Sequence, residues 1–128
     1  MVSQNTKGIT VSVETNYQPE FSIPNQHKFV HTYRIRVTNE SEFTVQLMRR
    51  HWMIFDSAGT ISEVEGEGVV GIQPVIEPGE EHEYVSGCHL TSTIGKMVGM
   101  YTMQRIIDGK HFDVHIPEFT LIVPYVLN

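Results

Sequence analysis

Apolar and polar side chains alternate along most of this chain, and this period of two limits its fold more than any other feature. Residues 9–17 and 29–37 alternate in this way, and residues 96–107 and 112–123 do so again, with Pro117 interrupting the last stretch. Such alternation is typical of β-strands with one buried face. No window of helical length carries apolar residues at three- and four-residue spacing without a proline, glycine or β-branched run. The chain is therefore predicted to contain almost no helix.

Turn-forming residues separate the predicted strands. Two prolines and an asparagine mark residues 18–27 as a loop, while residues 56–59 and 108–109 indicate hairpin turns, and Pro78 with Gly79 indicates another turn. The apolar phase slips within residues 43–55, which a β-bulge or burial of both faces explains. Seven or eight short strands predict an all-β fold, an antiparallel β-sandwich of the fibronectin type III or immunoglobulin-like kind.

Length and composition limit the classes of protein that fit. A chain of 128 residues with 40% hydrophobic residues is expected to form one domain, residues 1–128, with a core that needs no disulfide or structural metal. The net charge of -6 repels a phosphate backbone, so no nucleic-acid binding is predicted. The single cysteine indicates a reducing compartment, and no apolar leader or membrane-length apolar segment is found. A cytoplasmic protein without membrane association is predicted.

One glycine motif has two interpretations. Gly66, Gly68 and Gly71 match Gly-x-Gly-x-x-Gly, which in dinucleotide folds precedes a helix whose N-terminus faces pyrophosphate. Two prolines and a turn in residues 72–79 leave no room for that helix. Residues 63–83 carry seven glutamates and no Lys or Arg, a charge of -7 that leaves +1 for the rest of the chain. The glycines either supply positive φ and a bulge where a strand crosses between sheets, or bind a nucleotide or pyrophosphate with a divalent cation.

Four arginines form the second candidate site. Arg34, Arg36, Arg49 and Arg50 concentrate positive charge on what are predicted to be two neighbouring strands. They are interpreted either as a solvated face or as a docking surface for an acidic protein partner. Trp52 lies among apolar residues and is predicted to belong to the core.

The remaining chemistry-bearing residues indicate neither metal binding nor catalysis. His111, Asp113 and His115 share one face of a predicted strand, ~6.8 Å apart, but no third ligand is identified near either pair. We predict a solvated face there, with no metal site and no cofactor. Cys88 and His89 are sequence neighbours on a strand and point to opposite faces, so they cannot act together as thiolate and base. Cys88 is predicted to be buried or incidental, and no catalytic residue is identified.

Several blocks of sequence, in order and spacing from Tyr33 to Pro124, together resemble the ApaG family of bacterial proteins. These blocks are RHWMI at 50–54, VEGEGVVGIQP at 64–74, EPGE at 77–80, YVSG at 84–87, GKMVG at 95–99 with Tyr101 and Met103, and IPEF at 116–119.

The resemblance implies a fibronectin type III or immunoglobulin-like sandwich with no established enzymatic activity. It links the chain by gene neighbourhood to diadenosine tetraphosphate hydrolase, and by phenotype to cobalt resistance and magnesium efflux under the name CorD. Related domains in a eukaryotic F-box protein and a polymerase-delta-interacting protein look like protein-interaction modules. The family's glycine motif, with its proposed pyrophosphate role, falls on Gly66, Gly68 and Gly71.

Two functional hypotheses follow. The first is a non-catalytic binding module that engages a protein partner through loops or an exposed sheet edge. The alternative is a metal-assisted sensor of a nucleotide or pyrophosphate through the loop from Gly66 to Gly71. A hydrolase has least support, because the sequence shows no convergent cluster of His, Asp or Glu around one pocket.

Overall fold

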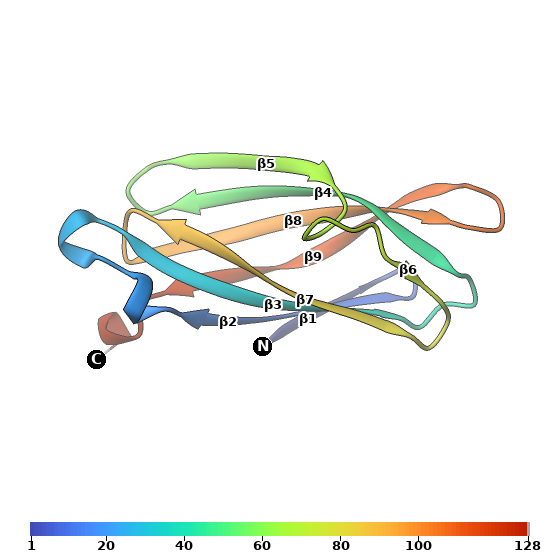
Figure 1. Ribbon diagram of the computed structural model, residues 1–128, viewed down its shortest axis with the longest axis horizontal. Coiled ribbons are helices and arrows are strands. Elements are labelled where there is room, and N and C mark those ends of the chain that lie inside the picture. The colour runs from blue at the N-terminus through green and yellow to red at the C-terminus, as the bar shows by residue number, and fades with distance from the viewer. Residues whose placement is uncertain (128) are drawn as a thin grey trace.

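Two antiparallel β-sheets pack face to face in the computed structural model, which describes residues 1–127 (Figure 1). Within these residues the strands are β1 (Val2–Thr6), β2 (Ile9–Tyr17), β3 (Phe29–Asn39), β4 (Val45–Asp56), β5 (Ile61–Glu67), β6 (Val75–Ile76), β7 (Glu81–Leu90), β8 (Ile94–Arg105) and β9 (His111–Ile122). The helices are short 3-10 turns, η1 (Pro19–Phe21), η2 (Pro24–Gln26) and η3 (Pro124–Leu127). The prediction of an all-β antiparallel sandwich with almost no helix is confirmed. No helix in the described part of the chain is long and apolar enough to cross a membrane.

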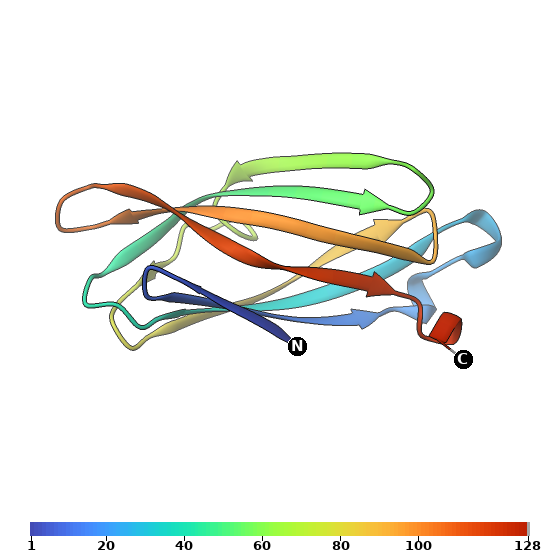
Figure 2. The ribbon, with the colours of Figure 1, turned by 180° about the vertical axis from the view of Figure 1, so that it is seen from behind.

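Within residues 1–127, the edges of the two sheets pack against each other on the side formed by β9, β1 and β2. One sheet has the order β1-β2-β3-β7, and the other has the order β5-β4-β8-β9 with β6 also paired to β4. On one side β9 packs against β1 and β2 (Figure 2). There the N–H of His115 donates to Oγ1 of Thr6 (3.3 Å). On the other side, β7 and β5 are the end strands of their sheets. That side of the sandwich is open at the sheet edges.

The core follows from the alternation. Every second residue of β3 from Phe29 points inward, including His31, which is 1% exposed. Trp52 is 3% exposed and packs edge-on against Tyr33 and Phe119, with ring centroids 5.6 and 5.7 Å away. The prediction that Trp52 belongs to the core is confirmed. These aromatic rings join the two sheets, since they come from β3, β4 and β9.

One strand is not predicted by the sequence pattern. β1 pairs with β2 through a tight turn in which Lys7 and Gly8 both have positive φ, 52° and 87°. Four of the five β1 side chains are exposed, so the strand has no apolar alternation to reveal it. Residues 1–127 contain nine strands, against the seven or eight predicted.

Two irregularities lie where the sequence departs from regular alternation. The register of β4 against β8 shifts between Leu47 and Arg49, so of the two explanations for the phase slip in residues 43–55 the structure shows the β-bulge. Pro117 interrupts the alternation, as predicted, because the buried positions change phase across it, although β9 continues through it as one strand. Phe119 pairs with Met97 while the register shifts beside it, so the proline lies at a second bulge. A bulge accommodates proline because the ladder there needs no N–H donor.

Candidate functional site

A cleft of about 230 Å³ opens between β7 and the loop that joins β5 to β6. Residues 84–86 line it from β7, residues 69–71 line it from the loop, and Tyr33, Arg50 and Trp52 complete its wall. We call it the β7 cleft. The glycine motif and one of the four candidate arginines therefore meet at the open side of the sandwich.

The glycine loop is shaped by backbone conformations that favour glycine. Gly68 and Gly71 have φ values of +64° and +82°, and a Cβ on Gly68 would stand 2.1 Å from the carbonyl oxygen of Ile72. The prediction of positive φ is confirmed for these two glycines. It is wrong for Gly66, which lies within β5 and has no positive φ. Between them Val70 also has positive φ, 46°, which is uncommon for a β-branched residue.

The loop does not mark a crossing between sheets, so that prediction is wrong. β5 and β6 both pair with β4, and the chain moves to the other sheet only after β6, at the turn formed by Pro78 and Gly79. No helix follows the motif in residues 72–79, as predicted. The physical reason is that the chain stops pairing with β4 at the end of β5, forms the loop, and then pairs with β4 again through β6.

Most N–H groups of the loop already have carbonyl partners. The N–H of Gly68 donates to the oxygen of Met48 (2.9 Å), and Val69 and Ile72 donate to each other's carbonyls (2.8 and 3.1 Å). Within the described residues, this leaves the N–H groups of Val70 and Gly71 to face a ligand. The phosphate role of the motif stays a prediction.

Arg50 fixes the loop against β4. Its Nη1 donates to the carbonyl oxygens of Glu67 and Gly68, both at 3.1 Å. The guanidinium lies over Gly66, where a Cβ would come within 3.1 Å of Nη1. Gly66 is therefore needed for space, because a side chain there would displace the guanidinium.

Arg50 is the one formally charged side chain that lines the β7 cleft. The hydroxyls of Tyr84 and Tyr101 are hydrogen-bonded to each other beneath it. Burial raises the pKa of Tyr84, and burial together with the Tyr84 neighbour raises the pKa of Tyr101, so both phenols stay neutral at physiological pH. The cleft thus offers one cation among apolar and neutral polar groups.

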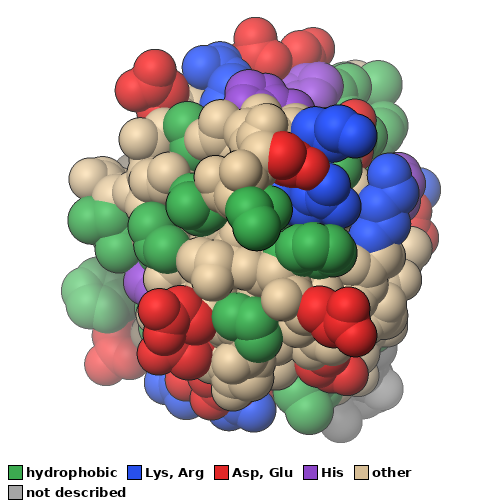
Figure 3. All heavy atoms as spheres, turned by 90° about the vertical axis from the view of Figure 1, so that its right-hand side faces the viewer, with side chains coloured by type: hydrophobic (Ala, Val, Ile, Leu, Met, Phe, Trp, Pro, Cys, Tyr) green, Lys and Arg blue, Asp and Glu red, His purple; other side chains and the backbone are tan. Residues whose placement is uncertain are grey.

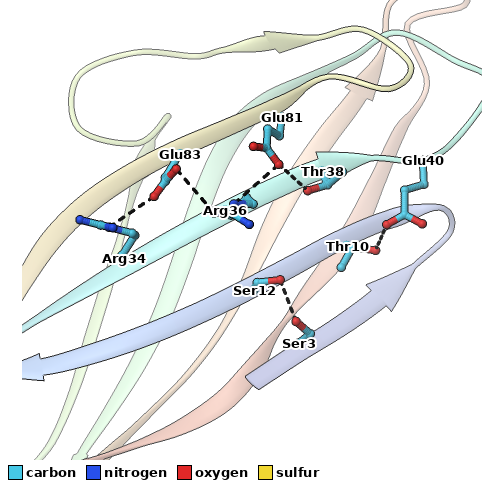
Figure 4. A network of polar contacts seen from close by, with 9 residues as sticks. All are labelled: Ser3, Thr10, Ser12, Arg34, Arg36, Thr38, Glu40, Glu81 and Glu83. Atoms are coloured by element: carbon cyan, nitrogen blue, oxygen red, sulfur yellow. Dashed lines mark hydrogen bonds and ion pairs between the residues drawn. The ribbon is translucent and has the colours of Figure 1, made fainter. Parts of the chain in front are cut away.

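The other three arginines lie elsewhere, and the prediction that all four share neighbouring strands is wrong. β3 and β4 belong to different sheets, because the chain changes sheets between them. Arg34 and Arg36 lie on the exposed face of β3 and form ion pairs with Glu83 and Glu81 of β7, at 3.3 and 3.6 Å (Figure 4). Arg49 is exposed on β4. Exposed pairs of this kind contribute ~0–1 kcal/mol each.

A group of side chains on the β4–β5 hairpin could hold a metal ion. Nε2 of His51 lies 2.9 Å from Oε1 of Glu63, and these atoms and a carboxylate oxygen of Glu65 all lie within 4.8 Å of one another. One imidazole and two carboxylates suit a divalent transition metal. This group of side chains was not predicted from the sequence. The signal was the hairpin itself, because counting equally along both strands from Asp56 and Thr60 brings His51 opposite Glu65.

The other candidates have the surroundings that the sequence predicted. His111, Asp113 and His115 are all exposed on one face of β9. Cys88 is buried whereas His89 is exposed, so the two side chains point apart. Burial, followed by the charge of Asp56, raises the pKa of the Cys88 thiol to about 11, which keeps the thiol protonated at neutral pH.

Comparison with known proteins gives a consistent result. A family model described as the ApaG domain matches residues 19–105. The "Protein ApaG" of Paramagnetospirillum magneticum is 47% identical over 125 residues, covering 98% of this chain and 95% of the relative, and that of Brucella canis is 47% identical over 124 residues, covering 97% and 95%. Among solved structures, a Bordetella pertussis protein described as ApaA is 45% identical with a TM-score of 0.87, covering 91% of this chain and 94% of that one.

Proposed function

This chain belongs to the ApaG family, and on that premise we propose that it is a non-catalytic binding module that engages a protein partner at the β7 cleft. The observation that carries this proposal is that the cleft opens beside an end strand. β7 pairs with β3 on one side only within the described residues, so part of its backbone faces outward. An extended segment of a partner can add to such an edge through main-chain hydrogen bonds.

Exposed apolar residues lie at or next to the same opening. Val70 lines the cleft and is 64% exposed, and Ile72 of the same loop is 51% exposed. Val85 of the β7 edge also lines the cleft and is 49% exposed, with its side chain on the outer face of the sheet. Apolar side chains gathered beside a cleft are typical of an interaction surface. They favour a partner segment that places an apolar or aromatic side chain in the cleft.

Arg50 gives this partner one charged feature. Within the described residues its hydrogen bonds use Nη1 alone, which leaves Nη2 and Nε to face an acceptor. A carboxylate on the bound segment would meet these donors in a partly enclosed setting, where a charge-assisted hydrogen bond is stronger than in bulk water. We therefore propose a partner segment with one acidic residue next to the apolar one.

The test is affinity capture from the organism's own cell extract followed by mass spectrometry. The variant Val85→Glu places a charge on the β7 edge, and the control Val2→Glu places the same charge on β1, the end strand at the opposite edge of the same sheet. We expect a partner that the unchanged chain and Val2→Glu capture and that Val85→Glu loses. Equal capture by all three chains would contradict the proposal. Binding of the captured partner should also weaken in Arg50→Gln.

A second candidate function is metal-assisted binding of a nucleotide or pyrophosphate at Gly66, Gly68 and Gly71. The observation that favours it is the position of Arg50 against this loop, close to the two N–H groups that have no carbonyl partner. For the divalent cation we propose His51 as one ligand, with the two glutamates opposite it. The links to cobalt, magnesium and diadenosine tetraphosphate that the family resemblance implies belong to this second proposal.

Calorimetry separates the two candidates. Because the segment 63–83 that contains the loop carries seven glutamates and no Lys or Arg, ATP alone should give no heat of binding. If the second proposal holds, ATP with Mg²⁺ binds to the unchanged chain and loses most of its affinity in Arg50→Gln. Co²⁺ affinity should fall in His51→Ala and stay unchanged in the control that replaces His111 and His115 by Ala. Absence of metal-dependent ATP binding would contradict the second proposal and leave only the protein-binding one.

A further inference from the structure

A cavity of about 380 Å³, larger than the β7 cleft, lies at the end of the sandwich that carries the β8–β9 hairpin. Phe43 and Phe112 line it, together with the buried residue Val45. Neither the glycine motif nor Arg50 belongs to this cavity. Small-molecule sites span roughly 300–1,000 Å³, so the volume suits a ligand of one or two rings.

The loop that carries Phe43 is held by a buried side chain. Asn39 is fully buried, and its Nδ2 donates to the carbonyl oxygens of Phe43 (2.7 Å) and Ile76 (2.9 Å). Its Oδ1 accepts from the N–H and the hydroxyl of Ser41 (2.9 and 2.6 Å). The amide has therefore used its donors and acceptors within the protein. This wall of the cavity is formed before any ligand binds.

The β1–β2 turn forms a second wall of the cavity, and a glycine allows it to lie close to the first. A Cβ on Gly8 would stand 2.9 Å from Cβ of Ser41, so the β1–β2 turn can approach this loop only with glycine there. The same turn places Lys7, in a left-handed conformation uncommon for its residue type, with Nζ 5.9 Å from the centroid of the Phe112 ring. Backbone strain of this kind persists where the surrounding structure over-determines it.

The cavity is positively charged although the chain carries a net charge of -6. Lys7, Arg105 and Lys110 line it together with His111, and among residues 1–127 no Asp or Glu is part of the lining. Arg105 lies over the Phe43 ring, 4.4 Å from its centroid, and pairs with Asp108. Within the described residues no ion pair engages either lysine. Lys, Arg and His side chains lie in the upper half of this end of the molecule, with Asp or Glu side chains among them (Figure 3).

We propose that this cavity binds a small phosphate monoester of an aromatic ring. The ring packs against Phe43 and Phe112, which supply apolar surface on two sides. The phosphate carries close to two negative charges at neutral pH, which match the two lysines that lack a carboxylate partner. Because the cavity is separate from the β7 cleft, this proposal stands or falls independently of the protein-binding one.

The experiment is a titration of the ¹⁵N-labelled chain followed by NMR, with three matched probes. Phenyl phosphate carries both ring and charge, phenol the ring alone, and inorganic phosphate the charge alone. We expect phenyl phosphate to shift the amide signals of Ser41, Phe43 and Lys110, with at least tenfold higher affinity than either fragment. The affinity should fall as NaCl is added, since the ion pairs are partly exposed. Phenyl phosphate that shifts no signal in this region at millimolar concentration would overturn the proposal.

Charge-removing variants complete the test. Replacing Lys7 and Lys110 together by Gln should lower the affinity for phenyl phosphate at least tenfold. The control Lys28→Gln, at the residue just before β3 begins, should leave it unchanged. The amide spectrum away from the cavity shows whether each variant is folded. Val85→Glu should bind as the unchanged chain does. Full affinity in the double variant, or a phosphotyrosine peptide that binds more tightly than phenyl phosphate, would overturn the assignment to a small molecule.

Discussion

The guanidinium of Arg50 lies against the backbone of Gly66, its partner across the β4–β5 ladder, so closely that a Cβ on Gly66 would stand 3.1 Å from Nη1. The same nitrogen donates to the carbonyls of Glu67 and Gly68, which begin the loop beside the β7 cleft. Arg50 and Gly66 are thus one structural unit, in which the glycine provides space and the arginine provides hydrogen bonds and charge.

Gly66→Ala is expected to displace Arg50 without unfolding the protein. The new Cβ meets the flexible end of a side chain, and the position has no positive φ, so the free energy of unfolding should fall by less than ~1 kcal/mol. Partner binding at the cleft should nevertheless weaken, since the guanidinium moves. Thermal unfolding and the NMR signal of the Arg50 side-chain Nε–H measure the two effects. A stability loss above ~2 kcal/mol would show that Gly66 is needed for the fold.

Gly68→Ala and Gly71→Ala form a matched pair. Both positions have positive φ, which costs roughly 1–2 kcal/mol for a residue with a Cβ. At Gly71 nothing lies within 4 Å of the new Cβ, whereas at Gly68 the Ile72 carbonyl oxygen lies 2.1 Å away. We expect a loss of roughly 1–2 kcal/mol for Gly71→Ala and roughly 2–4 kcal/mol for Gly68→Ala. Denaturant titration compares them, and equal losses would contradict the clash.

The strands could be predicted from sequence because alternation is a local pattern. The arrangement of strands in sheets could not. The chain leaves one sheet after Asn39 and enters the other at Val45. The Asn39 side chain holds this crossing in place by donating a hydrogen bond to the carbonyl oxygen of Ile76, far along the sequence. Because the sequence does not reveal this long-range contact, β3 and β4 are expected from sequence alone to be neighbours in one sheet. This is why Arg36 and Arg49 were wrongly predicted to share one surface.

The candidate site could be predicted only in its local parts. The conformations of Gly68 and Gly71 follow from the motif, because positive φ is a property of single residues. The position of His51 opposite Glu65 could be predicted, since it follows from the register of one hairpin. The β7 cleft was not, because it joins the glycine loop to Tyr84 of a strand that lies in the other sheet.

Trp52→Ala is expected to lower the free energy of unfolding by roughly 3–5 kcal/mol. The indole is buried between Tyr33 and Phe119 and also covers Gly99, where a Cβ would stand 2.5 Å from the ring. Removing it leaves a cavity that these neighbours cannot fill without moving both sheets. Denaturant unfolding measures the loss, and a value below ~1 kcal/mol would place Trp52 outside the core.

Asp56 joins two hairpins and should make stability depend on acid pH. Its Oδ2 accepts from the N–H and hydroxyl of Thr91 (2.7 and 2.8 Å), and its Oδ1 accepts from the N–H of Ala58 (3.1 Å) and from Ser92. Partial burial raises the pKa of Asp56, but these hydrogen bonds outweigh it and hold the pKa at about 2. The carboxylate therefore stabilises the contact between the β4–β5 turn and the β7–β8 loop.

The sign of the pH dependence follows from that lowered pKa. An unfolded aspartate has a pKa of ~3.9, so the unfolded chain takes up a proton first as the pH falls. The stabilisation by Asp56 is complete above about pH 4 and is lost as the pH falls toward 2. Asp56→Asn should lower the free energy of unfolding by roughly 1–2 kcal/mol at pH 7, since solvent screens this partly exposed charge. At pH 2 the same substitution should lower it by almost nothing. Denaturant unfolding at both pH values tests this, because a cost that stays constant with pH would show that the Asp56 charge contributes nothing to stability.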